Sequence, residues 1–157
     1  MPSIHSIVYQ PRDRRYGKRK GDYIRVALGG ARLIPQHGIE GDQKAGHHPE
    51  RNLNLLSLEW LNGLQAQGYK TAPGQFGEQI IVSGLAVEEL APGARLQLGD
   101  EAIIEITKLR TGCDRLAAAQ TTSLDNIEGL GALGAMARVI TGGRIAVGDD
   151  VRVTDKP

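Results

Sequence analysis

I-I-E-I-T-K-L-R-T-G-C-D-R-L, residues 103–116, combines the strongest strand pattern of the chain with its only cysteine. Branched and apolar side chains alternate imperfectly with Glu105 and Lys108, which predicts a buried strand. A Thr-Gly pair then breaks the pattern, and the good helix formers that follow predict a short helix. Cys113 is therefore expected at a strand-to-helix corner, near the first turn of that helix.

Two different roles fit Cys113. The positive end of the helix, Arg110 and Arg115 favour the thiolate over the thiol, although Asp114 opposes them. Only the thiolate is a nucleophile or a soft metal ligand. The alternative is a structural thiol that fills core volume, because free cysteine is among the most buried residue types.

Length and composition limit the class of protein. At 157 residues, the chain is expected to form one domain over residues 1–157. A single cysteine excludes an internal disulfide and no apolar run is as long as a membrane span, so a cytoplasmic protein with no membrane partner is expected. A net charge of +1 gives no chain-wide reason to expect nucleic acid as a partner. Twenty-one glycines against one Phe and one Trp predict many turns between short strands.

The first part of the chain predicts short strands around a basic segment. Residues 4–9 form the first expected strand, which Pro11 ends because proline cannot donate to a sheet ladder. Residues 12–20 hold six basic groups against one acid, a local charge of +5 that leaves −4 for the rest of the chain. This basic run is expected to be a solvated loop, and the alternative is an arm that binds anions. Residues 22–34 predict two strands separated by a Gly-Gly hairpin signal.

The remaining elements are predicted by similar local signals. Residues 52–56 form a strand that continues into a helix over residues 57–67, with Ser57 as its N-cap. A hairpin precedes the Cys113 strand, residues 121–126 are polar enough for a loop, and residues 135–153 give two or three closing strands. Two short helices without βαβ alternation predict a mainly β fold, a closed or nearly closed β-barrel.

Two loops are candidates for a site. The polar loop 37–51 is long enough to have a function. Four residues of this loop, His37, Asp42, His47 and His48, could bind zinc together with Cys113. Their spacing makes zinc unlikely. Residues 73–85 place two glycines around the only phenylalanine, which suits either an ordinary packed turn or the close approach of a flat ligand.

Six motifs in register resemble the MOSC domain, the family named for the C-terminal domain of molybdenum cofactor sulfurases. They are G-I-E-G-D (38–42), P-G-Q-F-G-E-Q-I (73–80), Gly84-Leu85, L-G-D (98–100), L-R-T-G-C (109–113) and G-A-M-A-R-V-I-T-G-G-R-I-A-V-G-D-D-V (134–151). The similarity is strongest over residues 38–153. It implies a stand-alone MOSC-like β-barrel that binds the molybdenum cofactor, molybdopterin.

The resemblance also implies roles for particular residues. Cys113 would carry a persulfide or ligate molybdenum, as a catalytic and metal-binding residue. The cofactor-binding positions would be Arg51, Ser57, Phe76, Gly77, Glu78, Gln79 and Arg110, with the two arginines as anion contacts. If so, the loop ending at Arg51, the Phe76 turn and Cys113 must meet at one site.

Several positions depart from the family pattern. The family commonly has Asn at the position of Gln79, Arg-His at Gln43-Lys44, and often Pro at Gly112. The chain also has neither the desulfurase domain of the sulfurases nor the N-terminal barrel of the amidoxime-reducing relatives. A stand-alone domain is therefore expected to bind an exposed cofactor, to recruit a separate sulfur-donor or redox partner protein, or to use its thiol in another way.

Three functions remain open from the sequence. The first is a cofactor-binding or sulfur-carrying domain, a component of a sulfurtransferase or of a molybdenum-dependent oxidoreductase. The second is a non-catalytic binding module on the same fold, with an unreactive Cys113. The third is a thiol-dependent enzyme that uses Cys113 with His47 or His48 as the base.

Overall fold

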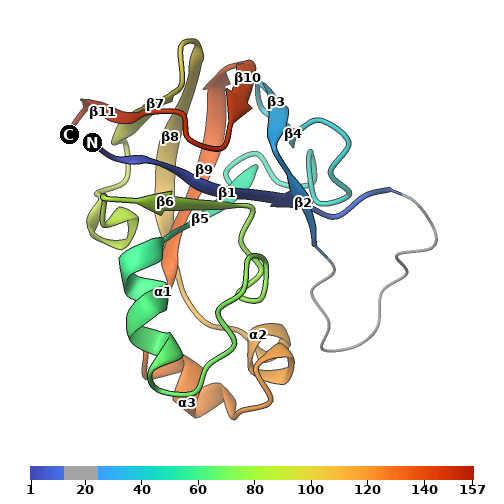
Figure 1. Cartoon of the computed structure of the whole chain (residues 1–157), viewed down its shortest axis with the longest axis vertical. Coiled ribbons are helices and arrows are strands. Elements are labelled where there is room, and N and C mark those ends of the chain that lie inside the picture. The colour runs from blue at the N-terminus through green and yellow to red at the C-terminus, as the bar shows by residue number, and fades with distance from the viewer. Residues whose placement is uncertain (13–24) are drawn as a thin grey trace.

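The structure is a computed structural model that describes residues 1–12 and 25–157, with two β-sheets above a group of short helices (Figure 1). The strands are β1 (Ser3–Tyr9), β2 (Val26–Leu28), β3 (Gly30–Ile34), β4 (Gly38–Ile39), β5 (Leu53–Ser57), β6 (Ile80–Ser83), β7 (Arg95–Leu98), β8 (Ala102–Arg110), β9 (Gly134–Thr141), β10 (Gly143–Ala146) and β11 (Val151–Asp155). The helices are α1 (Leu58–Gln65), α2 (Asp114–Ala119), α3 (Leu124–Glu128) and the 3-10 turn η2 (Val87–Glu89). Of the basic run 12–20, all but Arg12 lie outside the described residues.

The larger sheet has eight strands in the order β11-β7-β8-β9-β5-β6-β1-β2. Most neighbours are antiparallel, and hairpin turns join β7 to β8 as predicted. Strands β5 and β6 are parallel, with α1 as the crossover between them. The expectation of no βαβ unit was therefore wrong at this one position, because parallel neighbours need a crossover connection rather than a tight turn.

A closed barrel is not confirmed. Strands β11 and β2 are the two ends of the larger sheet and do not pair with each other. The sheet curls so that the beginning of β1 meets the segment before β11, where the Ile4 amide donates to the Asp149 carbonyl at 2.9 Å and the Val151 amide to the Pro2 carbonyl at 2.9 Å. These bonds and one isolated bridge cover that edge of β1, but they do not extend into a strand ladder.

The smaller sheet holds three strands in the order β10-β3-β4. The hairpin predicted across Gly29-Gly30 was wrong, because β2 pairs with β1 in the larger sheet and β3 pairs with β10 in the smaller one. The glycine pair carries the chain from one sheet to the other. A Cβ on Gly30 would lie 3.2 Å from the Ile145 carbonyl oxygen, so the neighbouring strand leaves little room there.

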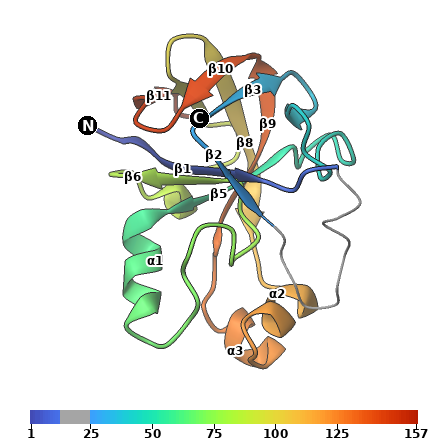
Figure 2. The ribbon, with the colours of Figure 1, turned by 45° about the vertical axis from the view of Figure 1, so that its right-hand side comes forward.

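Two hydrophobic clusters lie on opposite faces of the larger sheet. Strand β5 contributes Leu53 and Leu55 to the main core and Leu56 to the cluster under the helices, whereas Asn54 belongs to neither. The helices cover only part of this second face (Figure 2). Ser57 caps α1 as predicted, and its hydroxyl accepts from the Trp60 amide at 3.4 Å.

The segment expected to be a loop at residues 121–126 contains the start of α3. Ser123 is its N-cap and accepts from the Asn126 amide at 3.1 Å. Ile127 is fully buried in the second cluster. The polar residues of this segment were therefore a capping signal for a helix that tertiary packing stabilises.

Candidate functional site

A β-bulge in strand β8 changes which of its residues face the core as the strand approaches the site. Ile106 faces the main core, but Thr107 is an extra residue at a register shift, a β-bulge. After the bulge Leu109 packs against the core, so Lys108 and Arg110 point to the opposite face of the sheet. The imperfect alternation seen in the sequence is this bulge.

A row of side chains across neighbouring strands forms the floor of the site. Lys108 pairs with Met136, and Met136 pairs with Asn54. Gln79 continues the row just before β6, where its side-chain oxygen accepts from the Asn54 amide at 2.7 Å and its own amide donates to the Asn54 carbonyl at 3.0 Å. All four residues line one cavity.

Cys113 stands at the corner between β8 and α2. It is the N-cap residue of α2, its side chain is exposed, and its carbonyl accepts from the Ala117 amide at 3.0 Å. The predicted strand-to-helix corner is confirmed, and the alternative of a thiol buried in the core is wrong. Gly112 lets the chain pass close to α3, because a Cβ there would lie 2.1 Å from the Ile127 Cγ2 atom.

The turn 74–79 forms one wall, and three other segments donate to its carbonyl oxygens. Gln120 Nε2 donates to the Gln75 carbonyl at 3.3 Å, Arg110 donates to the Phe76 carbonyl, and Arg25 donates to the Gly77 carbonyl at 3.3 Å. These bonds join β8, the end of α2 and the start of β2 to the same turn. The wall is therefore fixed by tertiary contacts and not by the turn alone.

Glu78 holds the turn from the inside. It is 1% exposed, and its two carboxylate oxygens accept from the amides of Gly74 and Phe76. Burial raises the pKa of Glu78, and the hydrogen bonds and the charges of Arg110 and Arg25 oppose that rise. Glu78 thus serves the fold of the wall and does not line the cavity.

The loop before β5 forms the opposite rim. The loop is anchored at its start by the fully buried Asp42, which accepts from the Gln10 amide at 3.1 Å and the Lys44 amide at 3.2 Å. His47 Nε2 donates to the Gln43 carbonyl at 2.8 Å. His48 Nδ1 accepts from the Glu50 amide at 3.1 Å.

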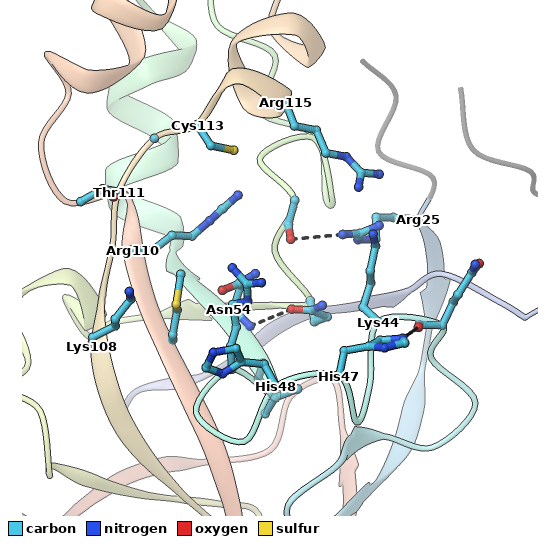
Figure 3. A pocket seen from close by; sticks show the side chains of 17 residues that line it. Arg25, Lys44, His47, His48, Asn54, Lys108, Arg110, Thr111, Cys113 and Arg115 are labelled. Carbon is cyan, nitrogen blue, oxygen red and sulfur yellow. Dashed lines mark hydrogen bonds between the residues drawn. The ribbon is translucent and has the colours of Figure 1, made fainter. Parts of the chain in front are cut away.

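These segments enclose an open cavity of about 670 Å³. Its lining residues are Arg25, Gln43, Lys44, His47, His48, Arg51, Leu53, Asn54, Gly77, Gln79, Lys108, Arg110, Thr111, Gly112, Cys113, Arg115 and Met136. In the part of the chain that the structure describes, six arginines and lysines line the cavity and no carboxylate does. Figure 3 shows Arg110 extending from β8 toward Cys113, with Arg115 and Arg25 across the same space. The cavity therefore favours an anionic ligand.

The expected convergence of the loop, the turn and the cysteine is confirmed, because Arg51, Gln79 and Cys113 line the same cavity. Gly77 and Arg110 line it as well. The other three residues named from the family resemblance lie behind the surface. Ser57 caps α1 and donates to Glu88 at 3.3 Å, Phe76 is fully buried against Trp60 and Tyr69, and Glu78 is enclosed by the turn.

Sequence reasoning missed several lining residues. Asn54, Lys108 and Met136 belong to strands that looked purely structural, and Arg25 follows a segment outside the described residues. A polar Asn between Leu53 and Leu55 was a local signal that could have been used. Nothing in the sequence alone showed that these strands are neighbours.

Neither a cluster of metal ligands nor a membrane-spanning helix is found in the described ranges. No group of three or more His, Cys, Asp or Glu side chains there is placed to hold a metal ion. None of the helices in residues 1–12 and 25–157 has the length and apolar character needed to cross a membrane.

The fold and the site define a mainly β protein that opens a cationic cavity around one exposed cysteine. The family model of the MOSC domain matches residues 42–152, and the chain belongs to the MOSC domain family.

Solved structures share the fold at low sequence identity. YiiM from Geobacillus stearothermophilus superposes with a TM-score of 0.73 at 18% identity, over 99% of this chain and 76% of that protein. YiiM from Escherichia coli superposes with a TM-score of 0.68 at 22% identity, over 99% of this chain and 71% of that protein. The YuaD protein from Bacillus subtilis superposes with a TM-score of 0.71 at 17% identity, over 96% of this chain and 94% of that protein. No curated protein sequence matches the chain significantly.

Proposed function

We propose that the cavity binds a molybdenum cofactor and that Cys113 either ligates the metal or carries transferable sulfur as a persulfide. The observation that carries this proposal is the exposed thiol in a cavity lined by six cations and, among the described residues, no carboxylate. Thiolate sulfur is a ligand for soft metals, and a cationic wall suits the phosphate of a pterin cofactor. Membership of the MOSC family supports the same assignment.

Unsatisfied polar atoms at the floor also fit a pterin. The Asn54 Oδ1 atom is buried without a hydrogen-bond partner among the described residues. The side-chain oxygen of Gln79 is used by the Asn54 amide, which leaves the NH₂ group of Gln79 for a ligand. A pterin ring presents donors and acceptors on its edges, so the two amides complement it. Gly77, with φ of 77°, lets the backbone approach a flat ring.

The other residues named for the cofactor have supporting or anionic roles in this proposal. Arg110 and Arg51 are anion contacts at two different places, Arg110 beside the turn and Arg51 on the opposite rim. Phe76 and Glu78 fix the wall that carries Gly77 and Gln79, and Ser57 fixes the start of α1. The longer side chain of Gln79, where the family commonly has Asn, reaches the backbone of β5 and stays on the floor.

The bound cofactor would supply a redox-active metal centre or an acceptor for sulfur. The chain itself would hold the cofactor and present a thiol that solvent and a second protein can reach. A separate sulfur-donor or redox partner completes the proposal. The alternative of a Cys–His enzyme has less support for His48, because its Nδ1 accepts from the Glu50 amide and the other nitrogen of the neutral ring then carries the proton.

Metal and pterin analysis of protein purified from a cofactor-making host tests the proposal. We expect molybdenum and pterin in the unaltered protein, or sulfane sulfur that a reducing thiol releases. Cys113→Ala and Cys113→Ser should keep the fold, because the side chain is exposed, and should lose the metal or the sulfur. Protein with no molybdenum, no pterin and no labile sulfur would contradict the proposal and favour a non-catalytic binding module.

A further inference from the structure

The cavity presents its cations in two different settings. Arg110 is 6% exposed and bound to the Phe76 carbonyl, so it is rigid and deep. Arg51 and Lys108 are exposed, and neither side chain makes a hydrogen bond or an ion pair with another described residue. Neither side chain has a counter-charge among the described residues, so both are available to an anionic ligand.

The segments that carry the two exposed cations are fastened to each other. The Thr107 hydroxyl at the bulge donates to the Glu50 carbonyl, which fastens the end of the loop to β8. On the other side of Arg51, the buried Asn52 side chain bonds to both the loop and β9. Arg51 is therefore presented from a segment that is anchored to the bulge of β8, immediately before Lys108 in the chain.

A third donor lies at the same rim. Because His48 Nδ1 accepts from the Glu50 amide, the proton of the neutral ring is on Nε2. Both His48 and the two cations line the cavity. Glu50 precedes Arg51 in the sequence but does not line the cavity.

Arg110 cannot take the place of this rim. Lys108 and Arg110 are two residues apart on β8, so their Cα atoms are about 7 Å apart. Arg110 is bound to the turn and extends toward Cys113 (Figure 3). If Arg110 binds a phosphate near the thiol, Arg51, Lys108 and His48 still have no acceptor for their N–H groups among the described residues.

We propose that Arg51, Lys108 and His48 form a second anion subsite, which binds a phosphate group different from the one near Arg110. This inference rests on the proposed cofactor site and adds a second anionic group to its ligands. That group belongs either to a phosphorylated substrate or to the second phosphate of a cofactor extended by a nucleotide. Both sources present the same chemistry to the rim, an oxyanion that accepts from two cations and an imidazole N–H.

Phosphate titration at low ionic strength tests the subsite. The probe is inorganic phosphate, added to protein from a host that cannot make the cofactor and followed by the backbone amide resonances of His48, Glu50, Arg51 and Asn52. We expect saturable shifts there and at least a tenfold weaker affinity in Arg51→Gln/Lys108→Gln. The matched control is Arg152→Gln/Lys156→Gln, which removes the same charge from and just beyond the far edge strand β11 and should change the affinity less than threefold.

The cofactor-loaded protein separates the two sources. Phosphate that still binds the rim of loaded protein assigns the subsite to a substrate. Loading that blocks the rim, with a nucleotide on the extracted cofactor, assigns it to the cofactor. Blocking by a cofactor without a nucleotide overturns the inference, as does unchanged affinity in the rim variant or equal weakening in the control. Each of these results is independent of the Cys113→Ala metal analysis, which tests the proposed function.

Discussion

The wall at residues 74–79 and the rim at His48, Arg51 and Lys108 face the same cavity but use their polar groups differently. In the wall, Glu78 is buried and accepts from backbone amides of the turn, and the buried Arg110 of β8 donates to a carbonyl of the same turn. At the rim, Arg51 and Lys108 are exposed, and their side chains have no partner among the described residues. Satisfied polar groups stabilise the fold, whereas unsatisfied ones are available to a ligand. Changes to the wall should therefore reduce stability, and changes to the rim should reduce binding alone.

The largest effect is expected for Glu78→Ala. It removes the acceptor of the Gly74 and Phe76 amides and a buried carboxylate whose charge interacts with Arg110. Leaving buried donors unpaired should lower the free energy of unfolding by about 3 kcal/mol, measured by urea denaturation. Glu89→Ala, on an exposed side chain, should stay within about 0.5 kcal/mol. Equal effects in both variants would remove the distinction between wall and surface.

A smaller loss is expected for Gly112→Ala, beside Cys113. The added Cβ would meet Ile127 at 2.1 Å, and such overpacking should lower the free energy of unfolding by about 2 kcal/mol. Gly63→Ala is the matched control, because it lies within α1 with nothing inside 4 Å of the added atom. The control should stabilise the protein by about 0.5 to 1 kcal/mol in the same assay. A stable Gly112→Ala protein would show that α3 can move away from the cysteine corner.

The pH dependence of stability should separate Glu78 from Glu105. The pKa of Glu78 is raised by burial, so its contribution to stability is present below the usual value of 4.5 and is lost as pH rises through the raised value. The pKa of Glu105 is lowered, first by its hydrogen bond to Arg138, so its contribution is present above 4.5 and is lost as pH falls through the lowered value.

Thermal unfolding from pH 3 to 8 checks these signs. As pH rises above 4.5, the unaltered protein should lose stability relative to the Glu78→Gln variant. As pH falls below 4.5, the unaltered protein should lose stability relative to the Glu105→Gln variant. Parallel curves for all three proteins would contradict both assignments.

The smallest effect on stability is expected for Arg51→Gln/Lys108→Gln. Because neither side chain has a partner in residues 1–12 and 25–157, the free energy of unfolding should change by less than about 0.5 kcal/mol. A loss above about 1.5 kcal/mol would place the rim with the wall and weaken its assignment as a ligand subsite.

Local signals in the sequence predicted much of the fold. The strand before Cys113, the helix after it and the Ser57 cap depend on residues close together in the chain, and all three are confirmed. The MOSC resemblance also located the cysteine corner, the Phe76 turn and Arg51 as segments that meet. These features were accessible because propensity, capping and strand periodicity act over a few residues.

Pairing over long distances was not accessible in the same way. The Gly29-Gly30 signal predicted a hairpin, but the flanking strands join different sheets. The parallel contact of β5 with β6 and the open ends of the larger sheet also depend on which edges are available after the rest of the chain has folded. The same limit hid Asn54 and Met136, which reach the cavity only because β5 and β9 are neighbours.

The sequence by itself determined the family, the mainly β composition and the cysteine at the corner, since each follows from residue types at fixed spacing. Tertiary structure decided which side chains share the cavity. The bulge at Thr107 turns Lys108 and Arg110 away from the core, and strand register then sets Lys108 in a row with Met136 and Asn54. A one-residue change in register reverses the face of every following side chain, so the cationic lining is a property of strand pairing and not of composition.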